Sequence, residues 1–352
     1  MQSIQDIQLG GKVIGSNHKP YIIAEMSGNH NQSLDRALEI VEEAAKAGAD
    51  AIKLQTYTAS TMTIDERGGL FSIDDEDSLW YGKNLYELYE LAHTPWDWHE
   101  PIFEKARQLG LMPFSTPFDE TSVNFLEELG VSAYKVASFE NTDWTLLKKI
   151  ASTGKPVIMS TGAANLSDID EAVRILRENG CPDLVLLKCT STYPATPENT
   201  NLVTIPRMCD IFNCHIGLSD HTLGIGAAVA SVALGARVIE KHFTLSRADG
   251  GVDAAFSIEP DEMKALVEES ERAFLALGDV QFGIQKAEKK SLRYKRSIYV
   301  VKDISEGEEF TKENIRVIRP GDGLKPKFFE KVLGKKSSRD IKRGTPLSWK
   351  LL

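Results

Sequence analysis

Two histidines of this sequence stand at the ends of short apolar segments and carry the side chain that most often binds metals in proteins. His221 directly follows the segment 215–220, and His242 closes the segment 237–242. If both segments are neighbouring parallel strands, the imidazoles lie at the same edge and could hold a divalent metal together with water and a substrate oxygen. The competing interpretation is that both rings form hydrogen bonds with backbone groups at the margin of the core.

Two lysines, Lys53 and Lys135, lie inside apolar segments, where an ammonium group is costly unless it meets an anion. Four hydroxyl side chains stand near the ends of similar segments. Together with the lysines they would form a cradle for a phosphate group, although each serine alone could equally cap a helix. The four are Thr116, Ser138, Ser160 and Ser219.

Three carboxylates accompany these cations. Glu25 ends the segment 21–25, and Glu140 follows the segment 133–138. Beside lysines and a metal, a carboxylate can act as a base, orient a hydroxyl or form an ion pair, and the sequence leaves these roles open. Asp253 lies in the glycine-rich stretch DGGVDAAFS and could accept hydrogen bonds from sugar hydroxyls.

Eight apolar segments carry these residues, and each is short enough to be a strand buried on both faces. Amphipathic segments separate them, and four of these end in glycine just before the next apolar segment, as connections from helix to strand require. Eight strands alternating with helices predict an α/β fold, a closed (β/α)8 TIM barrel, with the polar residues around its C-terminal mouth. The segments are 21–25, 51–55, 111–116, 133–138, 156–161, 184–189, 215–220 and 237–242.

Other patterns flank and interrupt the barrel, which is predicted to span residues 21–280. Residues 1–20 alternate around Gly10-Gly11 as a short hairpin does. The segment 57–95 is predicted to fold over the mouth, because long insertions after barrel strands tend to be functional. Residues 281–294 are predicted to be a basic linker. Residues 295–352 form a small module that should pack on the barrel or on another subunit.

Charge and cysteine content narrow the class of protein. The net charge of −10 argues against nucleic acid as the main partner. The four cysteines form no CxxC pair, which favours structural thiols in a reducing cytoplasm over a zinc cluster. The N-terminal residues lack an apolar signal core, and the most apolar later stretch, 224–239, is too short and glycine-rich to span a bilayer. The sequence predicts a cytoplasmic protein.

Eight motifs in order along the chain resemble those of the sialic acid synthase (NeuB-like) family: AEMSGNHN, DAIKLQTY, FSTPFD, YKVASFE, STG, KCTSTYP, GLSDHTLG and EKHFTL. The resemblance continues into residues 295–352, which are similar to the antifreeze-like (SAF) domain. It implies a metal-dependent enzyme that condenses phosphoenolpyruvate with an open-chain 2-acetamido sugar. The products are phosphate and a nine-carbon 2-keto acid.

The resemblance also implies roles for single residues. His221 and His242 match the metal ligands, usually of Mn²⁺ or Mg²⁺, and Glu25 matches a carboxylate near the reacting centre. Arg319 of VIRPGDG matches an arginine that the C-terminal module lends to the neighbouring subunit, which implies a domain-swapped homodimer. Phosphoenolpyruvate positions are matched by Lys53, Thr116, Lys135, Ser138, Ser160 and Ser219, and sugar positions by Gln55, Glu140, Tyr193 and Asp253.

Some segments differ from the members that make N-acetylneuraminate. Ser191 stands where those members carry Asn, which leaves its phosphate role open. The stretch LWYGKNLYELYELAHTPWDWH, with YKVASFE and KCTSTYP, resembles the branch that makes pseudaminic acid from 2,4-diacetamido-2,4,6-trideoxy-L-altrose. Phe139, beside Glu140, replaces a glycine of the other members and would suit a sugar that has a methyl group in place of a hydroxyl.

Other functions remain compatible with the residues. An N-acetylneuraminate or legionaminic acid synthase would use a manno-configured amino sugar instead. A pyruvate aldolase or a 3-deoxy-keto-acid phosphate synthase could be built on the same barrel, with Lys135 or Lys188 as a Schiff-base lysine in the aldolase. A non-catalytic sugar-binding protein would bind ligand without releasing phosphate, and it leaves the ring of polar strand ends unexplained.

Overall fold

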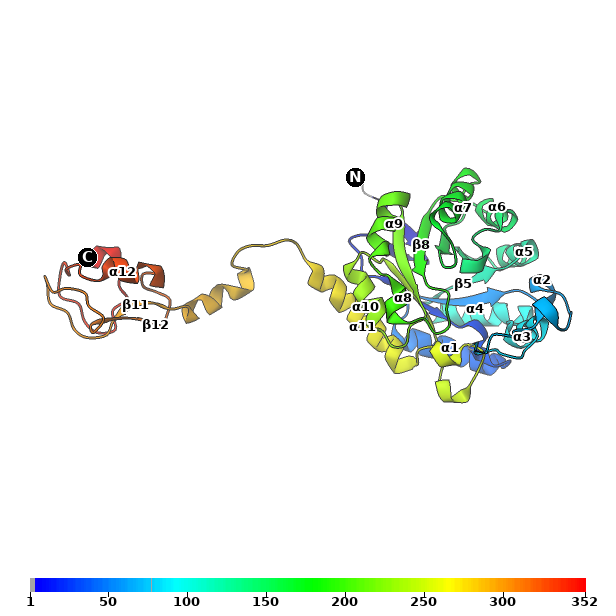
Figure 1. The fold of residues 1–352 in the computed structure, drawn as a ribbon, viewed down its shortest axis with the longest axis horizontal. Helices are drawn as coiled ribbons and strands as arrows, with labels where there is room; N and C mark the ends of the chain where they lie inside the picture. Colours follow the sequence, from blue (N-terminus) through cyan, green and yellow to red (C-terminus); the bar gives the residue numbers. More distant parts are fainter. Residues whose placement is uncertain (1–3, 77) are drawn as a thin grey trace. The chain divides into compact units, whose positions relative to one another are not determined.

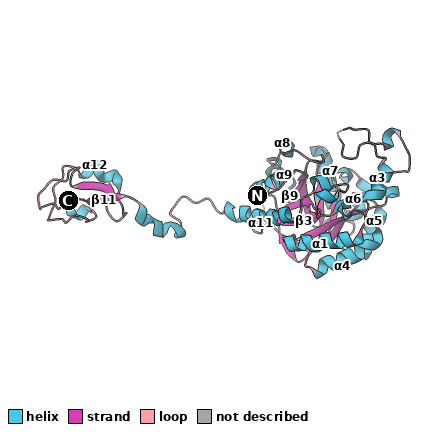
Figure 2. Cartoon of the chain, turned by 90° about the horizontal axis from the view of Figure 1, so that it is seen from below, coloured by secondary structure: helices cyan, strands magenta, loops and turns pink. Residues whose placement is uncertain are grey.

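The computed structural model describes residues 4–76 and 78–352, and the chain divides into two compact units at Gly278/Asp279. The first unit holds a closed barrel of eight parallel strands in the order β10-β3-β4-β5-β6-β7-β8-β9, as the sequence predicts (Figures 1 and 2). The strands are β3 Tyr21–Glu25, β4 Ala51–Thr56, β5 Met112–Pro117, β6 Tyr134–Val136, β7 Val157–Ser160, β8 Leu184–Cys189, β9 His215–Asp220 and β10 Val238–His242.

Helices surround the strands, and most of them bury an apolar face against the strands (Figure 2). Helix α1 shows how the local sequence sets the ends of a helix. The Ser33 hydroxyl accepts a hydrogen bond from the Arg36 N–H at its start, and Gly48 ends the helix with φ 87°. The helices of this unit are α1 Leu34–Ala47, α2 Ala59–Met62, α3 Leu85–Ala92, α4 His99–Gln108, α5 Glu120–Glu128, α6 Trp144–Ala151, α7 Leu166–Glu178, α8 Pro197–Thr200, α9 Thr204–Phe212, α10 Gly226–Ala233 and α11 Pro260–Leu277.

The period of two along each strand divides its side chains between two cores. One set packs outwards against the helices, as Ile22 and Ala24 do. The other set fills the barrel interior, as Tyr21 and Ile23 do, so that Glu25 is the next inward position of its strand. The same alternation in the other strands brings their inward polar positions together at the C-terminal mouth.

The predicted N-terminal hairpin closes the opposite end of the barrel. Strands β1 Ile7–Leu9 and β2 Lys12–Ile14 pair in antiparallel fashion, and Ile7, Leu9 and Ile14 join the interior core. Gly10 turns the chain at φ 57°, and a Cβ atom there would lie 2.5 Å from the Met112 side chain. The hairpin needs glycine at this position because its turn rests directly on the interior.

The insertion 57–95 carries α2, α3 and two short connections, and it is attached to the barrel by hydrogen bonds from the loop after β3. The Gln32 side chain donates to the carbonyls of Leu91 and His93, at 3.1 and 2.8 Å. The His30 ring lies 3.2 Å from the Thr94 hydroxyl. Within the described part of the chain, no helix is long and apolar enough to cross a membrane.

The second unit, Asp279–Leu352, has its own small core. Strands β11 Ser297–Val300 and β12 Ile315–Ile318 pair in antiparallel fashion, and α12 Phe329–Val332 packs beside them. The predicted linker 281–294 contains a 3-10 helix, Lys286–Tyr294, without buried residues. Phe310 and Leu347 are fully buried in the core of this unit, so the module is a compact body in its own right.

Candidate active site

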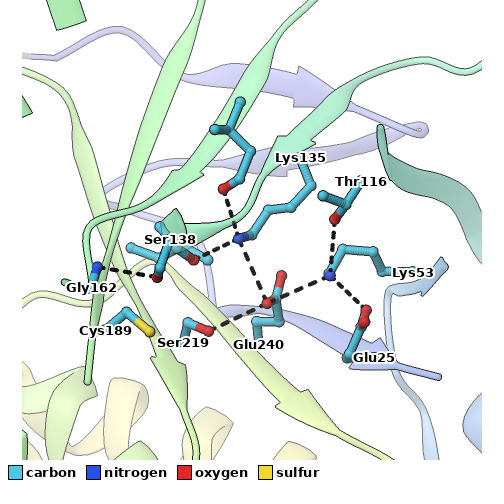
Figure 3. Close-up of polar contacts among 12 residues, drawn as sticks. Glu25, Lys53, Thr116, Lys135, Ser138, Gly162, Cys189, Ser219 and Glu240 are labelled. Atoms are coloured by element: carbon cyan, nitrogen blue, oxygen red, sulfur yellow. Dashed lines mark hydrogen bonds and ion pairs between the residues drawn. The ribbon is translucent and has the colours of Figure 1, made fainter. Parts of the chain in front are cut away.

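A cavity of ≈ 450 Å³ lies at the C-terminal mouth of the barrel and brings together nearly all barrel residues that the sequence predicts. Its charged base, called the floor here, consists of Glu25, Lys53, Lys135 and Glu240, all buried (Figure 3). Thr116 contacts the floor without lining the cavity. The predicted residues that line it are Glu25, Lys53, Gln55, Lys135, Ser138, Glu140, Ser160, Tyr193, Ser219, His221, His242 and Asp253.

Lys53 is held from two sides. Its ammonium group lies 2.6 Å from the Glu25 carboxylate and donates to the Thr116 hydroxyl at 3.2 Å (Figure 3). The Gln55 amide donates to Glu25 at 2.9 Å. Burial raises the pKa of Glu25. Burial alone would lower the pKa of the Lys53 ammonium group, but the negative charges of Glu240 and Glu25 outweigh it and raise that pKa. The Lys53 ammonium group is therefore charged and held in position before any ligand binds.

Glu240 stands between the two lysines. One of its oxygens lies 3.8 Å from the ammonium groups of both Lys53 and Lys135 and accepts from the Ser219 hydroxyl at 3.3 Å (Figure 3). Lys135 also donates to the Ser160 hydroxyl at 2.5 Å. Burial would raise the pKa of Glu240, but the two lysines outweigh it and lower that pKa. Burial lowers the pKa of Lys135 despite Glu240.

The two histidines lie side by side, with ring centroids 5.3 Å apart. The Nδ1 atom of His221 is 3.0 Å from the Thr190 carbonyl, which leaves Nε2 free for a ligand, as is usual for metal-binding histidines. The Nδ1 atom of His242 is buried and has no hydrogen-bond partner, and burial lowers the pKa of this ring well below its ordinary value. A neutral imidazole with an unpaired nitrogen suits a metal ligand.

A metal at this pair would need most of its ligands from elsewhere. Within residues 4–76 and 78–352, no group of three or more His, Cys, Asp or Glu side chains has the arrangement of a metal site. Asp253 is the nearest acidic neighbour, with an oxygen 3.6 Å from His242 Nδ1, and it accepts a hydrogen bond from Ser27. The residues fit a metal with two histidine ligands and open positions for water and substrate oxygens.

Glu140 and Tyr193 line the upper part of the cavity. Burial raises the pKa of Glu140 to about 7, and one of its oxygens is buried without a partner. The Tyr193 ring packs against His221, with centroids 4.5 Å apart. Both side chains therefore line the same cavity as the floor and the histidine pair.

Above the floor, one side of the cavity is apolar, and it is called the apolar wall here. It comes from the insertion 57–95, which confirms that this segment folds over the mouth. Phe139 joins its edge but remains 62% exposed. The insertion residues of the wall are Met62, Ile73, Trp80, Leu85, Leu88 and Tyr89.

Two further residues, Glu240 and Cys189, belong to the site although the sequence analysis did not predict them. Their positions in the strands could have revealed them. Glu240 stands two residues before His242, and Cys189 stands two after the interior residue Leu187. The Cys189 sulfur is 4.0 Å from His221 Nδ1, and this contact outweighs burial and lowers the thiol pKa to about 6. Cys189 therefore belongs to the site and is not merely a structural thiol.

Three other candidates have different surroundings. Lys188 points away from the cavity and donates to Thr190 at 2.6 Å, which does not suit a Schiff-base lysine. Ser191 lines the cavity, close to the Cβ position of Gly162, where any side chain would meet its hydroxyl at 2.1 Å. Arg319 follows β12 in the second unit, and its predicted role stays a prediction.

Comparisons with known proteins agree with this geometry. Residues 40–282 match the model of the NeuB family, and residues 295–352 match the SAF domain. The pseudaminic acid synthase of Campylobacter jejuni is 46% identical over 97% of this chain and 98% of that protein. The pseudaminic acid synthase of Helicobacter pylori is 43% identical over 94% of this chain and 96% of that protein.

Solved structures give the same assignment. The N-acetylneuraminic acid (sialic acid) synthetase of Leptospira borgpetersenii is 34% identical, with a TM-score of 0.73, and covers 84% of this chain and 98% of that chain. The spore coat polysaccharide biosynthesis protein SpsE of Bacillus subtilis is 33% identical over 99% of both chains, with a TM-score of 0.67. With its barrel and its C-terminal module both matched, the chain belongs to the NeuB family and carries a SAF domain.

Proposed function

We propose that this protein is a pseudaminic acid synthase. It condenses phosphoenolpyruvate with 2,4-diacetamido-2,4,6-trideoxy-L-altrose and releases pseudaminic acid and phosphate. The observation that carries the reaction class is the floor, where two buried lysines stand among hydroxyls and beside a histidine pair. The choice of sugar is supported by the relatives named pseudaminic acid synthase, which are 43–46% identical to the chain along nearly its whole length.

Phosphoenolpyruvate binds on the floor, where Lys53 and Lys135 neutralise its phosphate and carboxylate charges. Thr116 and Ser160 hold the two lysines in place through hydrogen bonds, at 3.2 and 2.5 Å. The remaining hydroxyls, Ser138 and Ser219, border the same space and can donate to phosphate oxygens. The sugar lies above it, beside Gln55, Glu140, Tyr193 and Asp253.

His221 and His242 would hold a divalent metal, Mn²⁺ or Mg²⁺, on the side of the cavity where the sugar aldehyde lies. When bound, such an ion supplies Lewis-acid polarisation of the aldehyde. The residues around the pair keep it ready for that role, because the Thr190 carbonyl orients the His221 ring and burial keeps His242 neutral.

The reaction forms one carbon–carbon bond and breaks one carbon–oxygen bond. Carbon C3 of phosphoenolpyruvate attacks the aldehyde carbon, and the aldehyde oxygen gains a proton. Water then adds at C2 and loses a proton. The bond between C2 and the oxygen that bridges to phosphorus breaks, which leaves the 2-keto acid and phosphate. Glu25 is the carboxylate placed to orient this water and accept its proton, since burial raises its pKa and Gln55 and Lys53 fix its position.

Substrate choice tests the proposal directly. Purified protein with Mn²⁺ and phosphoenolpyruvate is offered the L-altro 2,4-diacetamido-2,4,6-trideoxy sugar, its manno-configured counterpart and N-acetylmannosamine, and phosphate release is followed. We expect the highest kcat/KM with the altro sugar. A higher value with a manno-configured sugar would assign the chain to legionaminic or N-acetylneuraminic acid synthesis instead. Substrate-dependent trapping by borohydride with pyruvate would indicate an aldolase.

An isotope experiment tests the bond that breaks. With phosphoenolpyruvate labelled by ¹⁸O in the oxygen that bridges C2 and phosphorus, C–O cleavage sends the label into phosphate. Retention of the label in the keto acid would rule out this route. Mass spectrometry of both products gives the answer in one reaction.

We further propose a homodimer in which Arg319 of each chain serves the partner's cavity. The arginine would bind the sugar or its carboxylate product from the open side of the mouth. The test mixes two inactive variants, Arg319→Ala and His242→Ala, after unfolding and refolding together. Half of the dimers then contain one chain of each variant. In such a mixed dimer only the barrel of the Arg319→Ala chain has both His242 and an Arg319 from its partner, so about a quarter of wild-type activity should return. No recovery would contradict the shared site.

A further inference from the structure

Trp80 connects the insertion to the opposite rim of the cavity. Its indole N–H donates to the Val252 carbonyl at 2.9 Å, in the loop after β10. Its ring lies 6.0 Å from the Tyr193 ring, which in turn lies 4.5 Å from His221. Trp80 is therefore the residue of the apolar wall that is linked to His221 through the Tyr193 ring.

The two segments that Trp80 joins are also packed together near Gly28. A Cβ atom at Gly28 would lie 2.4 Å from a Val252 methyl group and 3.1 Å from the Ala92 carbonyl at the end of α3. Glycine is needed there because the insertion and the loop after β10 meet over the same backbone. The loop that accepts the Trp80 hydrogen bond is thus itself packed against the end of α3.

The arrangement orients an open-chain sugar. If its aldehyde carbon meets phosphoenolpyruvate between the floor and the histidine pair, its distal carbons extend upwards past Tyr193 towards Trp80. The Trp80 N–H is already bonded to Val252, so the ring offers an apolar face without a free donor. A hydroxyl against that face would lose a hydrogen bond to water, whereas a methyl group would gain burial.

We propose that Trp80, together with the wall residues Ile73 and Leu88, is the specificity determinant for the deoxy end of the sugar. The wall accepts the C6 methyl group and discriminates against a C6 hydroxyl. This inference rests on the proposed function, because it takes the aldehyde end to lie at the histidines. It assigns to the insertion a substrate role that none of the strand-end residues supplies.

The experiment compares two sugars that differ in one group only: the L-altro trideoxy sugar and its analogue with a hydroxyl on C6. Three variants are measured in the presence of Mn²⁺. Trp80→Ala removes the apolar face, Trp80→Phe keeps an apolar ring without the N–H, and Tyr81→Ala is the matched control, since Tyr81 is 54% exposed and does not line the cavity. For each variant, kcat/KM with both sugars and KM for phosphoenolpyruvate are determined.

We expect Trp80→Ala to lower the preference for the deoxy sugar by about tenfold or more, the range in which one apolar contact discriminates. Trp80→Phe should keep the preference within about threefold, and Tyr81→Ala should leave it unchanged. KM for phosphoenolpyruvate should stay the same in all three. An equal loss with both sugars in Trp80→Ala would overturn the inference, and so would a loss of preference in Trp80→Phe as large as in Trp80→Ala.

Failure of the proposed function gives a different result. If the wild-type protein does not turn over the trideoxy sugar at all, the function is wrong and the inference falls with it. If the wild type prefers that sugar but the preference survives in a folded Trp80→Ala protein, only the role of the wall is wrong. Thermal unfolding of each variant shows that the comparison is made between folded proteins.

Discussion

The floor and the apolar wall face the same cavity but are held in different ways. Floor residues stand on the inward positions of barrel strands, whose neighbours on both sides fix the backbone. Wall residues stand on the insertion 57–95, whose helices α2 and α3 have 4 and 8 residues. Side-chain bonds to loop carbonyls, such as that of Trp80 to Val252, attach the insertion. Reacting groups need fixed positions, whereas a wall that selects a substrate can tolerate small movements.

The charge distribution follows the same division. Four ionisable groups of the floor compensate one another, so each would be left as a buried unpaired charge if its partner were removed. The wall has no such network of charges, and losing one of its side chains leaves no buried unpaired charge. Changes on the floor should therefore stop the reaction, and changes on the wall should alter which sugar reacts.

Replacing Lys53 by Met should have the largest effect, because the variant keeps the length of the side chain and loses the charge that is proposed to hold phosphoenolpyruvate. We expect kcat/KM to fall by about 10³, together with a rise in KM for phosphoenolpyruvate. Steady-state kinetics measures both. Lys188→Met is the matched control, because Lys188 is a strand-end lysine that points away from the cavity. Wild-type kinetics in a folded Lys53→Met protein would contradict the role of the floor.

Removal of divalent metal should lower activity by about 10² or more, and Mn²⁺ should restore it. His242→Gln should weaken Mn²⁺ binding by about tenfold or more, because it removes one of the two proposed protein ligands. Calorimetric titration of Mn²⁺ measures this without any turnover. Trp80→Ala serves as the control and should bind Mn²⁺ like the wild type. Unchanged Mn²⁺ affinity in the His242 variant would exclude this pair as the metal site.

Glu140 lines the same cavity as floor and wall and should make stability depend on pH. Its pKa is about 7 in the folded state and near its ordinary value of 4.5 in the unfolded chain. Between these values the folded state binds more protons, so the free energy of unfolding falls as pH rises from 4.5 to 7 and then levels off. The free energy of unfolding of Glu140→Gln should not fall in this way. The difference between the variant and the wild type should therefore grow, as pH rises, by on the order of 2 kcal/mol in favour of the variant.

The measurement for Glu140 is urea unfolding of both proteins at pH 5, 6, 7 and 8. A difference between them that does not change with pH would show that the Glu140 carboxyl group ionises normally in the folded state. Glu128→Gln, at the exposed end of α5, is the control and should behave like the wild type.

Replacing Phe139 by Gly should have the smallest effect on the choice of sugar. Phe139 lines the cavity but is 62% exposed, so it offers less apolar contact than the wall residues of the insertion. We expect the preference for the trideoxy sugar over N-acetylmannosamine to fall by about threefold. An unchanged preference would remove Phe139 from the specificity determinants and leave the selection to Trp80 and its neighbours.

Much of the architecture follows from the sequence because periodicity is a local property. Short apolar segments separated by amphipathic ones predict eight strands, and each lies within one or two residues of its predicted position. The period of two along a strand places Glu25, Lys53 and Lys135 on the inward side of the mouth. The same rule points to Glu240 and Cys189, so these two could have been found from the sequence by extending each strand inwards by alternate residues.

The apolar wall could not have been derived in this way. Trp80 lies 172 residues from Val252 in the sequence, and no local pattern indicates that its N–H bonds to that carbonyl. Likewise, the charge compensation between Glu240 and the two lysines depends on distances of 3.8 Å from its carboxylate oxygen to the ammonium groups of Lys53 and Lys135, which stand on different strands. The chemical types and their strand positions were determined by sequence alone. Which charges share one oxygen, and which ring bonds to the loop after β10, was decided by tertiary structure, because only the folded chain brings distant segments within contact distance.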